Sequence, residues 1–247
     1  MKNILKVNGF FYILFFISIL TGQFKMYINI TLITLFHELG HIFMGLIFHY
    51  KIERIVIVPF GALTVFNKRI NEYFIKDLII TIAGPLNQIL LIPFLEDNKL
   101  NILLLFFNLL PIIPLDGSKI LNLILNLIFP YRLSYKITFY ISIILILLFF
   151  KFNLTIIILI IIYIINNIKY IKNINFFFNK FLFERYLYGI KYIRARTIFG
   201  YKLKNIKRFH NNDFLIKNKI FNETEILSDL FDVNVKIKTD KNVKVKS

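Results

Sequence analysis

The chain has 247 residues, of which 57% are hydrophobic, and its mean hydropathy is +0.66. This composition is far more apolar than that of a soluble globular domain and predicts a membrane protein. The formal net charge is +17, and residues 175–247 alone carry 16 Lys and Arg against 7 Asp and Glu. Such a basic tail fits an anionic membrane surface at least as well as DNA, and we expect no direct binding of nucleic acid.

The sequence contains no cysteine. Disulfides, thiolate metal sites and a cysteine nucleophile are therefore excluded. The histidines are His37, His41, His49 and His210. Any metal site must combine members of this short set with carboxylates.

Six apolar stretches have the length of about 17–25 residues that a membrane-spanning helix needs. They are 4–22, 27–49, 74–95, 100–129, 134–150 and 153–171. We interpret the first as a retained helix and not as a signal peptide, because it lacks a small-residue cleavage pattern and leads directly into the next span. The fourth is interrupted by "NLLPIIPLDG" (108–117), whose prolines predict a turn packed within protein and a helix that resumes near Ser118.

Six spans place both termini on the same side of the membrane. The connections on that side contain Lys51, Arg54, Lys68, Arg69, Arg132 and Lys136, in addition to the basic tail. The opposite connections contain Lys25, Lys99 and Lys151. By the positive-inside rule, both termini are expected to face the cytoplasm.

The segment "KIERIVIVPFGALTVFNKR" (51–69) comes after the second span. Its β-branched residues and central "PFGA" predict a short β-hairpin, which is apolar enough to dip into the membrane or lie against it. The expected fold is thus an all-α polytopic membrane protein with about six transmembrane helices, this hairpin and a small basic cytoplasmic tail. We expect a transmembrane domain over 1–174 and a basic cytoplasmic C-terminal region over 175–247, the latter either a small subdomain or a set of membrane-surface helices.

The segment "HELGH" (37–41) lies inside the second apolar stretch. On a helix, His37 and His41 lie one turn apart on the same face, and Glu38 lies beside them. This H-E-x-x-H spacing is typical of zinc metalloproteases, in which the histidines hold the metal and the glutamate acts as a base on water. A buried polar network without a metal is the structural alternative.

Catalytic zinc usually has three protein ligands, so a third must be found. Six residues beyond His41, where some metalloproteases place another histidine, stands Ile47. His49 is expected at the membrane surface, which makes it a poor ligand. Asp116 lies in the interrupted fourth stretch, where an unpaired carboxylate costs about 2.5–3.5 kcal/mol. We therefore predict a zinc site formed by His37, His41 and Asp116, with Glu38 as the catalytic base.

"HELGH", "IAGPLNQ" (82–88) and "NLLPIIPLDG" together make the chain resemble the site-2 protease family of intramembrane zinc metalloproteases, and most closely its sporulation branch. The resemblance covers roughly residues 1–200. It implies a zinc endopeptidase that cleaves an inactive, membrane-associated sigma-factor precursor during endospore formation, in the cell membrane or the membrane around the forespore. Membrane regulatory proteins and membrane lipids are the further partners that it implies.

The resemblance assigns the zinc ligands and the base to the same four residues. It also places Asn108, Pro111 and Pro114 beside the active site, and it equates the hairpin that contains Gly61 with a loop that guides substrate. We therefore expect substrate contacts from Asn108, Pro111 and Gly61.

Other features set limits on the resemblance. The tail keeps at most the opening, "FLFERYLYGIK" (181–191), of the nucleotide-sensing CBS domain that the sporulation branch commonly carries. The remainder of the tail looks too short and too polar for a full domain of that kind, so we do not predict nucleotide sensing. A transporter or channel with broken helices and an inactive scaffold are the competing classes, and the intact Glu38 argues against the scaffold.

Overall fold

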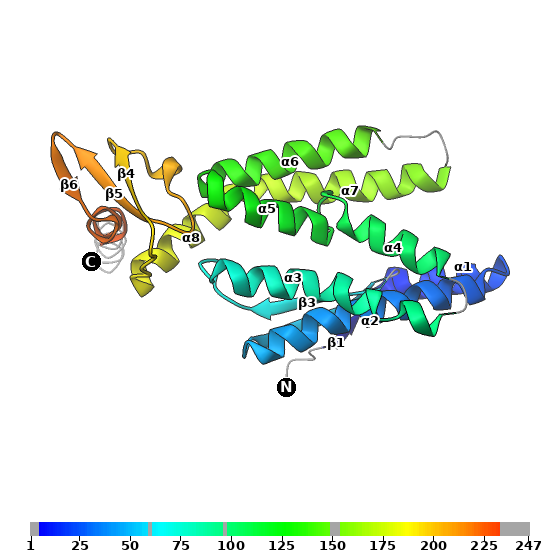
Figure 1. The fold of residues 1–247 in the computed structure, drawn as a ribbon. Helices are drawn as coiled ribbons and strands as arrows, with labels where there is room; N and C mark the ends of the chain where they lie inside the picture. The colour runs from blue at the N-terminus through cyan, green and yellow to red at the C-terminus, as the bar shows by residue number, and fades with distance from the viewer. Residues whose placement is uncertain (1–4, 59–60, 96–97, 149–153, 233–247) are drawn as a thin grey trace, which may run out of the picture. The chain divides into compact units, whose positions relative to one another are not determined.

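A computed structural model describes residues 5–58, 61–95, 98–148 and 154–232 of the chain. Helices dominate, as the sequence predicts, but two small sheets accompany them (Figure 1). The chain forms two compact units. One runs up to Lys68 and includes Phe74–Leu121, and the other combines Arg69–Tyr73 with the chain from Asn122 onward.

The first unit is built mainly from helices. In chain order its elements are β1 (Leu5–Val7), α1 (Gly9–Leu20), α2 (Phe24–Ile47), β2 (Lys51–Val58), β3 (Gly61–Asn67), α3 (Phe74–Ile89), the 3-10 helix η1 (Ile92–Phe94), α4 (Lys99–Leu109) and the start of α5 (Asp116–Ile128). α2 and α3 cross very closely, because a Cβ at Gly40 would overlap the backbone carbonyl of Ala83. A small residue at this point lets the two backbones approach.

The predicted hairpin is present as two antiparallel strands. β2 pairs with β3 in a register that places Ile55 opposite Thr64. Pro59 and Phe60, the middle of the expected turn, lie outside the described residues. β1 adds to β2 in parallel, so the strand order is β1-β2-β3 and β3 is an edge strand.

The all-α expectation is therefore wrong at the start of the chain. The predicted helix over 4–22 is reduced to the 12 residues of α1, because Leu5–Val7 instead complete the ladder of β2. The N–H of Asn8 extends this pairing by donating to the carbonyl of Ile57 at 2.9 Å. The open edge of a β-branched strand supplies backbone partners that a local reading of an apolar run cannot anticipate.

Among the described residues, three helical segments are long and apolar enough to cross a membrane by length and composition. They are Phe24–Ile47, Phe74–Phe94 and Tyr131–Leu148. That the chain has six membrane-spanning helices remains a prediction. The break in the fourth apolar stretch is confirmed, since α4 ends at Leu109 and α5 begins at Asp116, two residues before the expected start. A carboxylate in the first turn is favoured by the helix dipole.

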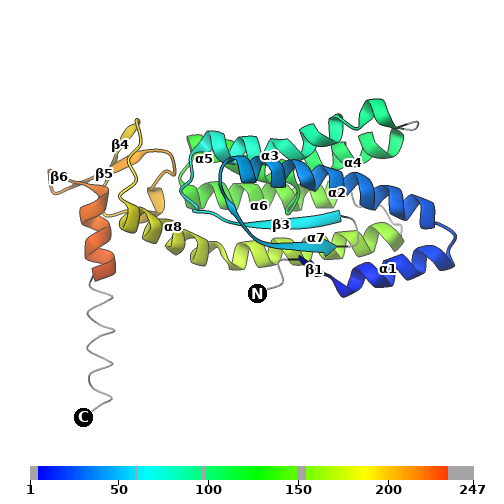
Figure 2. The same ribbon diagram turned by 90° about the horizontal axis from the view of Figure 1, so that it is seen from below.

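The second unit holds the rest of α5, two long helices and a small α/β assembly (Figures 1 and 2). Its further elements are α6 (Tyr131–Leu148), α7 (Leu154–Lys172), α8 (Ile174–Tyr188), β4 (Ala195–Phe199), η2 (Leu203–Asn205), β5 (Asn211–Ile216), β6 (Lys219–Phe221) and a helical segment over 223–232. β4 is parallel to β5, and β6 is antiparallel to β5. α8 ends at Tyr188 and is capped by Gly189, whose φ of 52° is the left-handed conformation that favours glycine.

The described part of the tail has an apolar core of its own. Phe181, Ile206, Phe214 and Leu227 are completely buried. The ring of Tyr131 stacks on that of Phe181 with centroids 4.2 Å apart. The described part of the tail is thus folded around an apolar core, to which Tyr131 of α6 also belongs. A separate subdomain over 175–247 stays a prediction.

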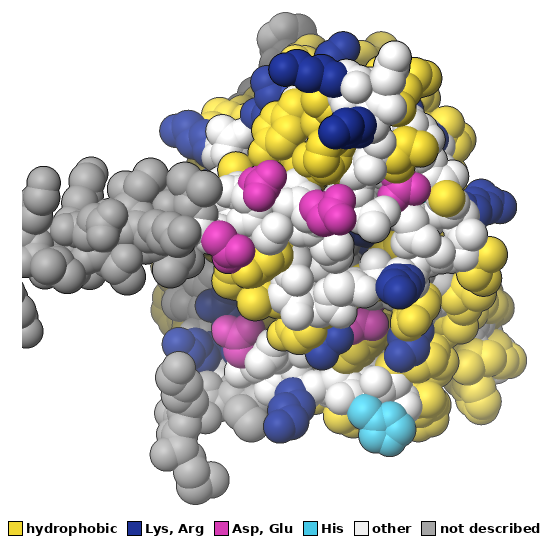
Figure 3. All heavy atoms as spheres, turned by 90° about the vertical axis from the view of Figure 1, so that its left-hand side faces the viewer, with side chains coloured by type: hydrophobic (Ala, Val, Ile, Leu, Met, Phe, Trp, Pro, Cys, Tyr) yellow, Lys and Arg dark blue, Asp and Glu magenta, His cyan; other side chains and the backbone are white. Residues whose placement is uncertain are grey.

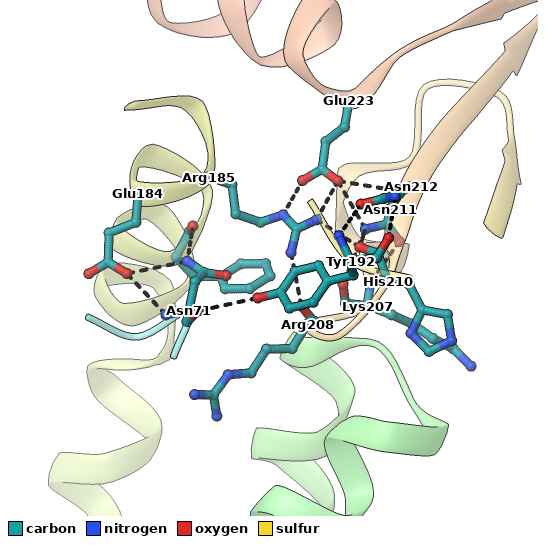
Figure 4. Close-up of polar contacts among 11 residues, drawn as sticks. Asn71, Glu184, Arg185, Tyr192, Lys207, Arg208, His210, Asn211, Asn212 and Glu223 are labelled. Carbon is teal, nitrogen blue, oxygen red and sulfur yellow. Dashed lines mark hydrogen bonds and ion pairs between the residues drawn. The ribbon is translucent and has the colours of Figure 1, made fainter. Parts of the chain in front are cut away.

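A buried polar network supports this core (Figure 4). The Arg185 guanidinium is paired with Glu223 and donates to the backbone carbonyls of Arg208 and His210 at 2.9 and 2.7 Å. The amide of Asn212 bridges the same carboxylate and the carbonyl of His210. The Arg185–Glu223 network is structural, because its buried charges are mutually satisfied.

On the face shown in Figure 3, Lys and Arg side chains are interspersed with Asp and Glu.

Candidate metal centre

α2 carries the two histidines of HELGH into the interior of the first unit. His37 and His41 are 5% and 6% exposed. Their spacing of four residues puts both imidazoles on one face of the helix, with the two Nε2 atoms 3.2 Å apart.

The third member comes from the first residue of α5. Asp116 is buried, and its Oδ2 lies 2.9 Å from Nε2 of His37 and 2.9 Å from Nε2 of His41. The tight turn before α5 depends on Gly117, because a Cβ there would overlap the backbone of Leu109 and Leu110. In the chain, Asp116 is 79 residues from His37 and 75 residues from His41, yet the three side chains meet at one point.

The outer nitrogens of both imidazoles are already engaged. Nδ1 of His41 lies 2.7 Å from the carbonyl of Ile80, which can only accept a hydrogen bond. Nδ1 of His37 lies 2.9 Å from Oε1 of Gln88, whose Nε2 donates to the carbonyl of Asn101 at 3.0 Å. These partners assign the proton of each neutral imidazole to Nδ1 and leave both Nε2 lone pairs directed inward.

Three acceptor atoms therefore converge, namely two imidazole nitrogens and one carboxylate oxygen. The ligand atoms of the three residues all lie within 4.8 Å of one another. Such a cluster of lone pairs is unfavourable unless a cation or added protons lie between them. The donor set fits a divalent metal, and two histidines with one carboxylate are a known catalytic zinc set.

α3 closes the site from one side. A Cβ at Gly84 would overlap Nε2 of His41 and lie 2.6 Å from Nε2 of His37. Asn87, on the same helix, donates from its side chain to the carbonyl of Phe36. The "IAGPLNQ" segment thus packs α3 onto α2 around the histidines, and it supplies Gln88 as the hydrogen-bond partner of His37.

Glu38 lies next to the histidines in sequence and faces the hairpin. Its Oε1 accepts a hydrogen bond from the backbone N–H of Thr64 in β3 at 2.7 Å. The side chain is only partly buried, unlike those of the two histidines. The Glu38 carboxylate is therefore held by β3 and takes no part in the cluster of ligand atoms.

The residues expected to contact substrate occupy three places in the first unit. Asn108 is in the last turn of α4, Pro111 is in the loop before Asp116, and Gly61 starts β3 opposite Val58. Their role stays a prediction. His49 takes a left-handed conformation (φ 60°) just after α2, where it ends the helix.

His210 belongs to the second unit and takes no part in the cluster. Burial and the neighbouring charges of Lys207 and Arg194 lower the pKa of its imidazole.

Sequence reasoning missed three residues at this site: Gln88, Lys119 and Thr64. Lys119, which is partly exposed, places its Nζ 2.7 Å from Oδ1 of Asp116, the oxygen that does not face the histidines. Its spacing of three residues from Asp116 within an apolar segment could have predicted this ion pair. No sequence pattern could have identified Thr64, because its contact is made by the backbone N–H.

Known proteins are similar to this chain over part of its length. No protein-family model matches the chain. The chain is 30% identical over 148 residues to stage IV sporulation protein FB of Bacillus subtilis (strain 168), a match that covers 54% of this chain and 51% of that protein. It is 36% identical over 119 residues to a zinc metalloprotease of Methanocaldococcus jannaschii, covering 41% of this chain and 34% of that protein.

The solved structure of a site-2 protease from Methanocaldococcus jannaschii matches with a TM-score of 0.52 at 27% identity. That match covers 67% of this chain and 89% of the solved one. Together these matches support the assignment of the chain to the site-2 protease family. The aligned region spans about half or less of the length of the two curated relatives. The similarity to the site-2 protease family therefore concerns the aligned part of the chain.

Proposed function

We propose that this chain is an intramembrane zinc metalloendopeptidase, in which His37, His41 and Asp116 hold Zn²⁺ and Glu38 is the catalytic base. The observation that carries the proposal is the convergence of three buried acceptor atoms from His37, His41 and Asp116. The Nδ1 atoms of both histidines already have hydrogen-bond partners, so their Nε2 atoms are directed at the cluster. A purely structural polar network would instead pair donors with acceptors.

A zinc ion held by these side chains supplies Lewis acidity, which polarises a carbonyl group and acidifies water. The protein's own contribution to the reaction is proton transfer by Glu38. Its carboxylate accepts a proton from the attacking water as the new C–O bond forms, and it returns that proton to the amine nitrogen as the C–N bond breaks.

For the substrate we propose a membrane-associated protein, specifically an inactive sigma-factor precursor cleaved during endospore formation. Similarity to stage IV sporulation protein FB supports this assignment. The three apolar helical segments support a membrane location. We further propose that the whole chain has six spans and that both termini face the cytoplasm. Asn108, Pro111 and Gly61 are proposed to contact the substrate, and membrane regulatory proteins to control access.

The decisive experiment is co-expression of the full chain with an epitope-tagged sigma-factor precursor from a spore-forming bacterium. Wild type should shorten the precursor, and Glu38→Gln should not, while still carrying about one zinc per chain in detergent. Asp116→Ala should lose both zinc and cleavage. Glu53→Gln, an exposed acid on β2, serves as the matched control. Undiminished cleavage in Glu38→Gln would exclude the mechanism.

A further inference from the structure

The edge strand β3 runs alongside α2 (Figures 1 and 2). Thr64 lies opposite Ile55 of β2, yet its N–H points out of the sheet and donates to Oε1 of Glu38 at 2.7 Å. The outer edge of this strand is therefore not open at Thr64. Its backbone donor is used by the side chain of the proposed base.

A second contact fixes the strand on the same face of the helix. The ring of Phe66 lies against Gly45, where a Cβ would overlap the ring. Gly45 is seven residues, or about two helical turns, beyond Glu38. Thr64 makes its contact through the backbone N–H, and Phe66 makes its contact through the ring. The strand is thus held along α2 at two points, one apolar and one polar.

A hydrogen bond from a backbone N–H to a carboxylate is charge-assisted and directional. It restrains rotation of the Glu38 carboxylate about its last torsion angle, which is otherwise broad. In the described part of the chain, no hydrogen bond engages the other carboxylate oxygen, Oε2. One oxygen is therefore anchored, while the other is left for the reactants.

We propose that Thr64 is a positioning residue that orients the general base through its main-chain amide. This inference rests on the proposed function, since it assigns Glu38 the transfer of the proton. It couples the hairpin to catalysis, because any movement of β3 along α2 changes the direction in which the carboxylate points. The hairpin then has a role in the chemical step besides guiding substrate.

The test compares two substitutions that differ in the amide hydrogen. Thr64→Pro removes the donor, and proline is tolerated on an edge strand where the N–H faces outward. Thr64→Val keeps the donor and the β-branched shape. The full chain in detergent micelles is assayed on fluorescein-labelled casein for kcat and KM, and its zinc content is measured.

We expect kcat of Thr64→Val to exceed that of Thr64→Pro by about 10²-fold, the usual effect of a misplaced catalytic group, with similar KM and full zinc in both. Equal kcat values in the two variants would overturn the proposal. So would loss of zinc from Thr64→Pro, since the amide would then support the metal site and not the base.

A second variant covers the case in which Thr64→Pro does not fold. Gly45→Ala pushes the Phe66 ring, and with it β3, away from the helix, and Leu46→Ala at the exposed neighbouring position is its control. A fall in kcat for Gly45→Ala alone, with zinc retained, supports the inference, and a wild-type kcat overturns it. Glu38→Gln, assayed in parallel, separates the two hypotheses: cleavage that survives there removes the proposed function itself.

Discussion

Gly84 of α3 lies directly against Nε2 of His41, so that a Cβ at Gly84 would overlap this nitrogen. Because the overlap involves a buried imidazole held by the Ile80 carbonyl, the ring has little room to move. Gly84→Ala should therefore displace His41 and weaken zinc binding by about 10–100-fold, as expected when the geometry of a ligand is disturbed. Competition with a chromogenic chelator measures the affinity.

Gly9→Ala is the matched control for that substitution, because a Cβ at Gly9 meets nothing within 4 Å. Zinc affinity should stay at the wild-type value in this control. If Gly84→Ala binds zinc as tightly as wild type, the close contact between α3 and the two imidazoles does not restrain the ligands.

The hydrogen bond between Gln88 and His37 yields a second prediction. Gln88 is completely buried, and its Oε1 fixes the tautomer and the ring orientation of His37. Gln88→Leu keeps the approximate volume but removes the acceptor, so zinc affinity should fall by about 10–100-fold. Gln23→Leu, at the exposed start of α2, is the control. Equal affinities in the two variants would contradict a role for Gln88 in supporting His37.

Zinc should also stabilise the fold. The three ligands come from α2 and α5 and are brought together only in the native structure, so binding favours the folded state. At a zinc concentration about 100 times Kd, the expected gain is about 2.7 kcal/mol. Thermal unfolding in detergent should thus show a higher Tm for wild type with zinc than after chelation, and no such difference for Asp116→Ala. A shift that persists in Asp116→Ala would place the zinc elsewhere.

The proximity of the three clustered residues could be predicted from sequence for two different reasons. His37 and His41 are recognised by a helical spacing, which is a local pattern. Asp116 was identified by the cost of an unpaired carboxylate in an apolar segment, which is an energetic argument that does not depend on distance along the chain. The partners Gln88 and Thr64 satisfy neither condition, because a buried amide and a backbone N–H are ordinary features until the tertiary contacts are known.

The same distinction applies to the fold. The break before α5 results from local prolines, and the hairpin results from local β-branched residues. In contrast, the pairing of Leu5 with Ile55 joins segments far apart in the chain, and the ion pair between Arg185 and Glu223 joins α8 to the last described helix. Charged residues in a basic tail suggest solvent exposure, so the buried network that organises this region could not be read from composition.

The Arg185–Glu223 pair is the basis of the last prediction. The Arg185 side chain is 2% exposed, and Glu223 neutralises it while also accepting hydrogen bonds from Asn212 (Figure 4). Glu223→Gln leaves a buried guanidinium without its counter-charge, which costs about 3–5 kcal/mol. Hydrogen exchange of the full chain should then be faster in β4 and β5, and unchanged in α2. Asp229→Asn, on the same helical segment, should leave the exchange of β5 as in wild type. Equal protection in Glu223→Gln and Asp229→Asn would mean that the charge of Glu223 is dispensable and that the apolar core around Phe181 and Phe214 alone maintains the subdomain.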